Sequence, residues 1–303
     1  MGGDANPHSG FIQNVRYSDE SSLNTLDLYI PDAAAARDSR KVWIVFIHGG
    51  AWRDPAINAS TFTRTQNTLL GSGCAKQVAG YASLNYRLSP YPAHPTDPSN
   101  PSDPSRNAKH PDHINDILAA LLYLQEAYQF EDRYVLAGHS CGATLAFQVA
   151  AKRYWGSQYE ATFALELNVV PPLAILGLEG LYDLPALVKY HDREPIYAQI
   201  VENAFGSAAS WQGVSPASAD YKDSWQEGTL VVLAHSREDE LVEWQQVELM
   251  EAALIGQGWQ KHDDAQRRVR VMELRGTHDS VWKENTEVAR ALEWTIQQIV
   301  GHL

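Results

Sequence analysis

Gly138-His139-Ser140-Cys141-Gly142 follows the apolar run Tyr134-Val135-Leu136-Ala137 and precedes residues 143–151, which have the composition of a helix. A G-x-S-x-G pattern between a strand and a helix is typical of a sharp turn with the serine at its apex, because only glycine leaves room on either side. A helix that begins just after the serine directs free N–H groups towards negative charge developing there. The pattern by itself also fits an ordinary glycine-rich turn, so its meaning depends on the rest of the chain.

The composition is that of a globular α/β protein. The chain has 303 residues, of which 44% are hydrophobic and 20% are charged, and we expect one domain over 1–303. The net charge of −13 argues against nucleic acid or an anionic membrane as a partner. No apolar run approaches the length of a membrane span.

Cysteine usage and the first residues predict the compartment. Cys74 and Cys141 are the two cysteines of the sequence, which is too few for a disulfide framework. Residues 1–7 have neither the basic nor the apolar region of a secretory signal. We therefore expect a reducing, cytoplasmic environment.

Apolar runs that alternate with helical patterns predict a mostly parallel sheet flanked by helices, with right-handed crossovers. The expected strands are 11–17 and 25–30, which form an antiparallel pair, and then 42–47, 78–84, 134–137, 173–178, 230–234 and 269–274. The expected helices are 61–70, one around 114–122, 143–151, 243–256 and 284–300.

Four segments do not fit this alternation. Residues 1–10 read as a frayed tail, and the proline-rich stretch 90–111 is either a disordered insertion or part of a site wall. Residues 184–226 are irregular and aromatic, and we interpret them as a small helical cap. The polar segment 256–268 is expected to be a surface insertion.

Reactive side chains follow several of the predicted strands. In open parallel sheets ligands bind at the carboxyl ends of the strands, and Ser140, Asp239 and His278 all stand at such ends. A serine needs an imidazole as general base, and the imidazole needs an acid that fixes its tautomer. We assign Ser140 as nucleophile, His278 as base and then acid, and Asp239 as the orienting acid.

Two other acids compete for the last of these roles. Glu238 would point the other way on an extended segment, so Asp239 is preferred. Asp183 follows the preceding strand, and we expect it to cap or brace the cap segment.

His48-Gly49-Gly50-Ala51-Trp52, at the end of another buried strand, predicts an oxyanion hole. Its donors would be backbone amides of Gly49, Gly50 or Ala51 together with that of Cys141, and the sequence leaves open which of the loop amides donate. His48 is interpreted as structural. Trp52 would be either a flat wall beside the serine or a core tryptophan.

No cofactor or metal site is expected. His110, Asp112, His113 and Asp116 lie close in sequence, but the group lacks a convincing set of four ligands. Cys141 stands beside the centre of the pentapeptide, so it is interpreted as a packing residue with a useful backbone N–H.

Together these motifs resemble the kynurenine formamidase (arylformamidase) family of the α/β-hydrolase superfamily. The resemblance rests on His48-Gly49-Gly50-Ala51-Trp52, Asn85-Tyr86-Arg87-Leu88, the elbow Gly138 to Ala143, Gly180-Leu181-Tyr182-Asp183 and Gly276-Thr277-His278-Asp279. It covers the chain from about residue 11 onward, and the segments 90–111 and 256–268 depart from it.

The resemblance implies an α/β-hydrolase fold and hydrolysis of N-formyl-L-kynurenine to L-kynurenine and formate, in tryptophan breakdown towards NAD synthesis. It implies a small aromatic formamide as partner, and it leaves a homodimer open. Trp52, Tyr182 and Trp282 are candidate walls for the aromatic ring. Two alternatives remain: a general carboxylesterase of the hormone-sensitive-lipase-like type, and an inactive relative that acts as a binding protein.

Overall fold

A computed structural model describes residues 9–151 and 169–301. Within these residues eight strands form one sheet in the order β1-β2-β4-β3-β5-β6-β7-β8. β1 pairs antiparallel with β2, and β2 pairs antiparallel with β4. All other neighbours are parallel. The predicted antiparallel pair and mostly parallel sheet are both confirmed.

The strands lie close to the predicted apolar runs. They are β1 (Gly10–Arg16), β2 (Thr25–Ile30), β3 (Val42–Ile47), β4 (Val78–Leu84), β5 (Tyr134–His139), β6 (Ala174–Leu178), β7 (Leu230–Ser236) and β8 (Arg268–Leu274). The helices are α1 (Thr63–Leu70), α2 (Asp112–Tyr128), α3 (Cys141–Ala150), α5 (Leu184–Tyr190), α6 (Pro195–Phe205), α7 (Ala208–Val214), α8 (Gln245–Gly256), α9 (His278–Glu284) and α10 (Thr286–Val300).

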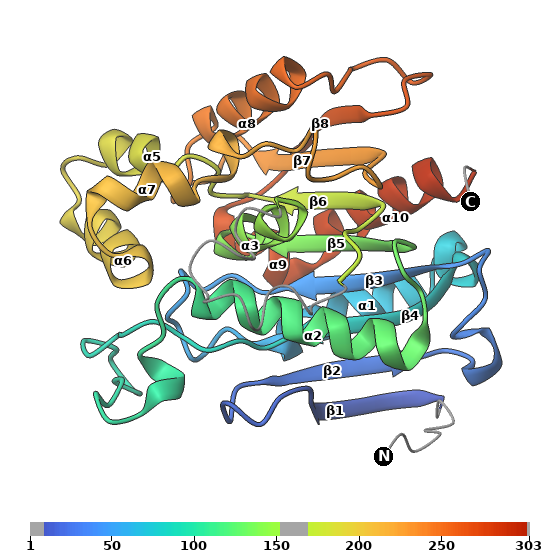
Figure 1. Cartoon of the computed structure of the whole chain (residues 1–303), viewed down its shortest axis with the longest axis horizontal. Helices are drawn as coiled ribbons and strands as arrows, with labels where there is room; N and C mark the ends of the chain where they lie inside the picture. Colours follow the sequence, from blue (N-terminus) through green and yellow to red (C-terminus); the bar gives the residue numbers. More distant parts are fainter. Residues whose placement is uncertain (1–8, 152–168, 302–303) are drawn as a thin grey trace.

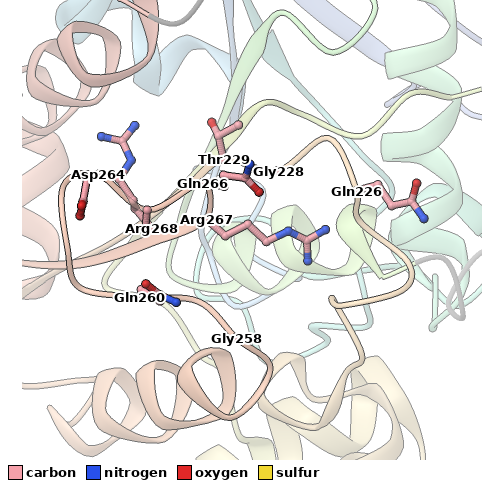
Figure 2. A pocket seen from close by; sticks show the side chains of 10 residues that line it. Gln226, Gly228, Thr229, Gly258, Gln260, Asp264, Gln266, Arg267 and Arg268 are labelled. Carbon is pink, nitrogen blue, oxygen red and sulfur yellow. The ribbon is translucent and has the colours of Figure 1, made fainter.

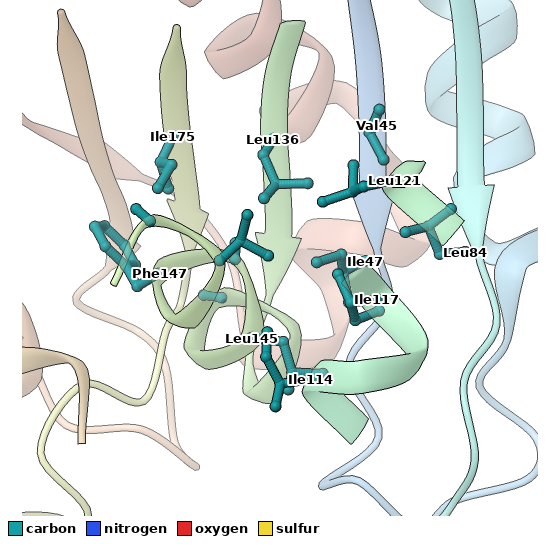
Figure 3. Close-up of a cluster of buried hydrophobic side chains, with 14 of the residues drawn as sticks. Val45, Ile47, Leu84, Ile114, Ile117, Leu121, Leu136, Leu145, Phe147 and Ile175 are labelled. Carbon is teal, nitrogen blue, oxygen red and sulfur yellow. The ribbon is translucent and has the colours of Figure 1, made fainter. Parts of the chain in front are cut away.

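Helices cover both faces of the sheet, which explains why its central strands are apolar without alternation. Along β3, Val45 and Ile47 face one side, where they join the core beneath α2 and α3. Ile44 and Phe46 face the other side and pack with α1 and α10. Figure 3 shows the first of these cores, with Ile117 and Leu121 of α2 lying over the strands.

The predicted helix over 284–300 is confirmed by α10, and a further short helix, α9, precedes it. Asn285 adopts a left-handed conformation, with φ of 62°, and separates α9 from α10. His278 is the first residue of α9, and Thr277 caps the amino terminus of this helix. The predicted helix over 61–70 likewise begins with a 3-10 turn, Ala59–Phe62, before α1.

The predicted cap consists of α5, α6 and α7, which lie beyond the carboxyl ends of the strands (Figure 1). The proline-rich loop 90–111 contacts this cap, because Asn203 donates to the carbonyl of Pro90 and the amide of His110 donates to that of Ala204. Residues 1–8 of the predicted tail lie outside the described residues. In the part of the chain that is described, no helix combines the length and apolarity that a membrane crossing requires.

Candidate active site

The elbow turns at Ser140, between β5 and α3. Ser140 has φ of 54° and ψ of −123°, a strained conformation of the kind that occurs at functional sites. A Cβ on Gly138 would lie 2.3 Å from the carbonyl oxygen of Gly142, and one on Gly142 would lie 2.3 Å from that of Ile47. Both glycines of the motif are therefore required by backbone contacts.

The structure brings His278 and Asp239, the predicted base and its orienting acid, into direct contact. His278 Nδ1 lies 2.8 Å from Asp239 Oδ2, while Asp239 Oδ1 accepts the N–H groups of Leu241 and Val242 at 2.9 and 2.8 Å. Burial alone would raise the pKa of Asp239, but the hydrogen bond from His278 and these backbone donors outweigh it and hold that pKa below its usual value. Asp239 is thus an oriented, ionised acceptor for His278.

The competing acids have other contacts. Glu238 accepts the backbone N–H of Gly276 at 3.4 Å. Asp183 caps α5 by accepting the N–H of Ala186 at 2.9 Å, as expected for a residue that braces the cap.

Glu179 places a second carboxyl beside the pair, and sequence reasoning missed it. It is fully buried, its Oε1 accepts the N–H of Ser236 at 3.3 Å, and its Oε2 lies 3.3 Å from His278 Nδ1. Burial and the neighbouring Asp239 charge raise the pKa of Glu179 far above its usual range. An ionised Glu179 could only accept hydrogen bonds, and its Oε2 would lack a donor, whereas the neutral acid carries an O–H donor of its own.

Two further histidines brace these groups. His139 Nε2 lies 3.3 Å from the carbonyl oxygen of His278, and burial lowers the pKa of His139 to about 3, which keeps its ring neutral. His235 Nε2 donates to the carbonyl of Val242 at 2.9 Å, in the same turn that holds Asp239. His139, Glu179 and His278 present ligand-type atoms within 4.8 Å of one another, but the hydrogen bonds just described account for their proximity. The expectation of no metal or cofactor stays a prediction.

The loop after β3 forms a tight turn of unusual conformation. Gly50, Ala51 and Trp52 have φ of 91°, 52° and 58°, and the N–H of Arg53 closes the turn on the Gly50 carbonyl at 2.9 Å. Successive amides in such turns make anion-binding concavities. The N–H of Trp52 donates to Cys141 Sγ at 3.2 Å, which ties the turn to the elbow.

The neighbouring residues have structural contacts. His48 stacks on Tyr86 with ring centroids 4.4 Å apart, its Nδ1 lies 2.9 Å from the Gly49 carbonyl, and burial lowers its pKa to about 4. This agrees with the structural interpretation of His48. A Cβ on Gly49 would lie 2.8 Å from His139 Nδ1, so Gly49 packs directly against the elbow.

A cavity of about 400 Å³ joins these parts, which is within the range of small-molecule sites. Ser140 and His278 line it together with Gly50 and Ala51 of the turn. Among the described residues, Ser140 Oγ has no hydrogen-bond partner, as is common before substrate binds. The remaining walls are largely apolar and aromatic: Trp52, Ile57, Tyr91, Leu181, Leu187, Ile196, Tyr197, Ile200, Val201, Leu241, Val242 and Trp282.

The aromatic residues expected at the site have different positions. Trp52 and Trp282 line the cavity, as predicted. Tyr182 does not: it is fully buried in the core, where its ring packs edge-on against Phe147 with centroids 5.4 Å apart. Its expected role as a wall is wrong, because the turn after β6 directs Leu181, and not Tyr182, to the cavity.

A larger cavity, of about 780 Å³, lies at the amino-terminal ends of β7 and β8, away from the carboxyl ends of the strands, where Ser140 and His278 lie (Figure 2). The polar segment 256–268 forms part of its wall. The side chains of Arg267 and Arg268, at the start of β8, point in opposite directions (Figure 2). The guanidinium of Arg267 donates to the carbonyl of Trp225, and that of Arg268 donates to the carbonyl of Gln298. These arginines stabilise the fold, and we place the chemistry in the smaller cavity, which holds Ser140 and His278.

Comparison with known proteins agrees with this geometry. The BD-FAE family profile matches residues 26–254. The chain is 38% identical to a kynurenine formamidase-like hydrolase, fscH, of Fusarium equiseti, covering 96% of this chain and 95% of that one. It is 33% identical to kynurenine formamidase avaC of Aspergillus versicolor, covering 92% and 96%.

Among solved structures, an esterase of Thermogutta terrifontis with butyrate bound superposes with a TM-score of 0.63 at 18% identity, over 98% of this chain and 95% of that one. At this identity the likeness concerns the fold, which is that of the α/β-hydrolases. The elbow, the histidine–aspartate pair and these matches agree: the chain belongs to the kynurenine formamidase family of hydrolases, within the BD-FAE group.

Proposed function

We propose that this hydrolase cleaves the formyl amide of N-formyl-L-kynurenine through a formyl-enzyme on Ser140, and so supplies L-kynurenine in tryptophan breakdown. The observation that carries the proposal is the cavity lined by Ser140, His278, the strained turn and aromatic side chains, with Asp239 Oδ2 2.8 Å from His278 Nδ1. The names of the relatives support the choice of substrate.

In this mechanism Ser140 Oγ attacks the formyl carbon while His278 takes the serine proton through Nε2, since Nδ1 faces Asp239. Amides of Gly50, Ala51 and Cys141 would bind the oxyanion. His278 then returns the proton to the aniline nitrogen, which breaks the C–N bond and leaves the formyl ester on Ser140. Water activated by His278 attacks that ester and releases formate.

The test is turnover of N-formyl-L-kynurenine by the full chain, followed as release of both kynurenine and formate. Ser140→Ala should lower kcat at least about 1000-fold, and an unchanged rate would reject the mechanism. Because the same groups would cleave an ester, a neutral aryl acetate is assayed in parallel. Ester turnover without any formamide turnover would replace the proposal with a general carboxylesterase.

A further inference from the structure

Arg53 occupies an unusual position in the catalytic cavity. It follows Trp52 in the strained turn and lines the cavity, yet only 6% of its surface is exposed. Because it is two residues from Ala51, its Cα is at most about 7 Å from that of Ala51. A substrate with its formyl oxygen on the turn therefore has its remaining groups within reach of this side chain.

The guanidinium of Arg53 has no anionic partner within the described residues. No carboxylate lies within 4.0 Å of it and no hydrogen bond leaves it in these parts of the chain. Its guanidinium carbon lies over the ring of Tyr91, 4.0 Å from the ring centroid. Arg106, which is buried to a similar degree, instead forms an ion pair of 2.9 Å with Asp97. Arg53 differs in that its guanidinium lines the cavity without an acidic partner among the described residues, and it is therefore available to an anionic group of a ligand.

The acids around the cavity are engaged elsewhere. Asp54 Oδ1 accepts the N–H of Ala56 at 2.9 Å and lies 3.4 Å from His94 Nε2. Asp279 bonds Lys283 at 2.6 Å and Trp282 at 3.3 Å. Glu194 lies 3.4 Å from His191. Burial lowers the pKa of the Arg53 guanidinium, but arginine stays charged in proteins, so the cavity is lined by a positive group that has no carboxylate within 4.0 Å among the described residues.

We propose that Arg53 binds a carboxylate of the substrate, and that the site therefore selects aromatic formamides that carry a carboxylate. The planar guanidinium matches a carboxylate with two parallel hydrogen bonds. Stacking on Tyr91 orients that plane. The formyl group lies in the strained turn, the aromatic ring lies between the tryptophan walls, and the carboxylate of the amino-acid part pairs with Arg53. This inference rests on the proposed function for the formyl amide of the substrate, and on the position of Arg53 for the carboxylate of the substrate.

The experiment compares two formamides on the full chain: N-formyl-L-kynurenine and its decarboxylated analogue. The unmodified protein should prefer the carboxylated one in kcat/KM by about 10- to 100-fold, as expected for a hydrogen bond to a charged group. In Arg53→Met this preference should fall to within about threefold of unity, mainly through KM. Arg53→Lys should give an intermediate ratio, because it keeps the charge without the fork.

Arg40→Met is the control, since Arg40 is another arginine, its side chain is 87% exposed and it pairs with nearby Asp38; it should keep the full preference. Equal losses on both formamides in Arg53→Met would overturn the inference and make Arg53 a support of the turn. If Arg53→Met does not fold, the inference is tested by the ratio of kcat/KM for the two formamides in the unmodified protein and by the same ratio in Arg53→Lys.

A pair of aryl acetates, with and without a carboxylate on the leaving group, separates the two proposals. If neither formamide is cleaved but the protein prefers the carboxylated ester and loses that preference in Arg53→Met, the formamidase function fails and the role of Arg53 stands. Turnover of both formamides at equal rates rejects Arg53 as a carboxylate site while the formamidase function stands.

Discussion

Cys141 has a larger role than the packing residue that the sequence suggests. It is fully buried, its Sγ accepts the N–H of Trp52 at 3.2 Å, and the hydroxyl of Tyr86 lies 3.6 Å away. Burial raises the pKa of the Cys141 thiol to about 11, so the thiol is neutral at physiological pH. The residue after the nucleophile thus contributes its amide to the predicted oxyanion hole and its sulfur to the turn that supplies the other donors.

Cys141→Ala should therefore lower kcat about tenfold with little change in KM, because a misplaced oxyanion donor weakens binding of the transition state alone. The unfolding free energy should fall by about 1–3 kcal/mol, the cost of leaving the Trp52 N–H without an acceptor. Cys141→Ser keeps an acceptor and should lose less activity. Steady-state kinetics and urea denaturation measure both effects.

Cys74→Ala is the control for this prediction, because Cys74 is the other buried free thiol and belongs to the core on the opposite side of the sheet. If Cys74→Ala and Cys141→Ala reduce kcat equally, the sulfur has no special part in holding the turn.

For single residues, the sequence predicts positions at strand ends better than it predicts their surroundings. The positions of Ser140, Asp239 and His278 could be predicted because each follows an apolar strand, and their roles as reacting groups stay predictions. Glu179 and Arg53 could not be predicted, because their importance depends on which distant groups lie near them: Asp239 is 60 residues from Glu179 in sequence, and Tyr91 is 38 from Arg53. The prediction that Tyr182 lines the site was wrong because Tyr182 lies in a turn, where the alternation of side chains along a strand does not determine which way the ring points.

Among the elements, the unit formed by β5, the elbow and α3 leaves little room for larger side chains at its glycines. Continuous apolar runs made the buried strands predictable almost to the residue, whereas helix boundaries such as the break at Asn285 depend on local conformation that hydrophobic periodicity does not record. Gly142, in the first turn of α3, is the point where this helix meets β3.

Gly142→Ala should destabilise the protein by about 2–3 kcal/mol or more, since the new Cβ would lie 2.3 and 2.6 Å from the carbonyl oxygens of Ile47 and His48 and overpacking against backbone cannot relax easily. Gly256→Ala is the control: it is also a helical glycine, but it is the last residue of α8 and its new Cβ would have no atom within 4 Å, so the unfolding free energy should change by less than about 1 kcal/mol. Urea denaturation compares the two, and equal midpoints would contradict the steric account of the elbow.

The whole fold gathers two carboxyls, from the ends of β6 and β7, beside a histidine at the start of α9. An ionised Glu179 in this cluster would destabilise the folded protein, because its charge would be buried beside that of Asp239. Burial at the carboxyl edge of the sheet and the charge of Asp239, which is fixed by its own turn, outweigh the N–H of Ser236, which favours the ionised form. Glu179 therefore keeps its proton in the folded protein at a pH at which the unfolded chain would release it.

This retained proton makes the stability of the molecule depend on pH. The pKa of Glu179 is raised in the folded protein, whereas an unfolded glutamate titrates near 4.3. The contribution of Glu179 is fully present below about pH 4.3 and is lost as the pH rises towards the folded pKa, by about 1.4 kcal/mol per pH unit. Asp239, whose pKa is lowered, is ionised in both states above pH 6 and adds no slope there.

Between pH 6 and pH 8 the unfolding free energy should therefore fall by about 2–3 kcal/mol more in the unmodified protein than in Glu179→Gln, which has no proton to lose. Glutamine resembles the neutral acid in shape and in having a donor, and the other titrating groups are the same in both proteins, so the difference between the two curves isolates Glu179. Urea denaturation at several pH values measures it. Parallel curves would mean that Glu179 is ionised in the folded protein, and His278 would then face two negative charges.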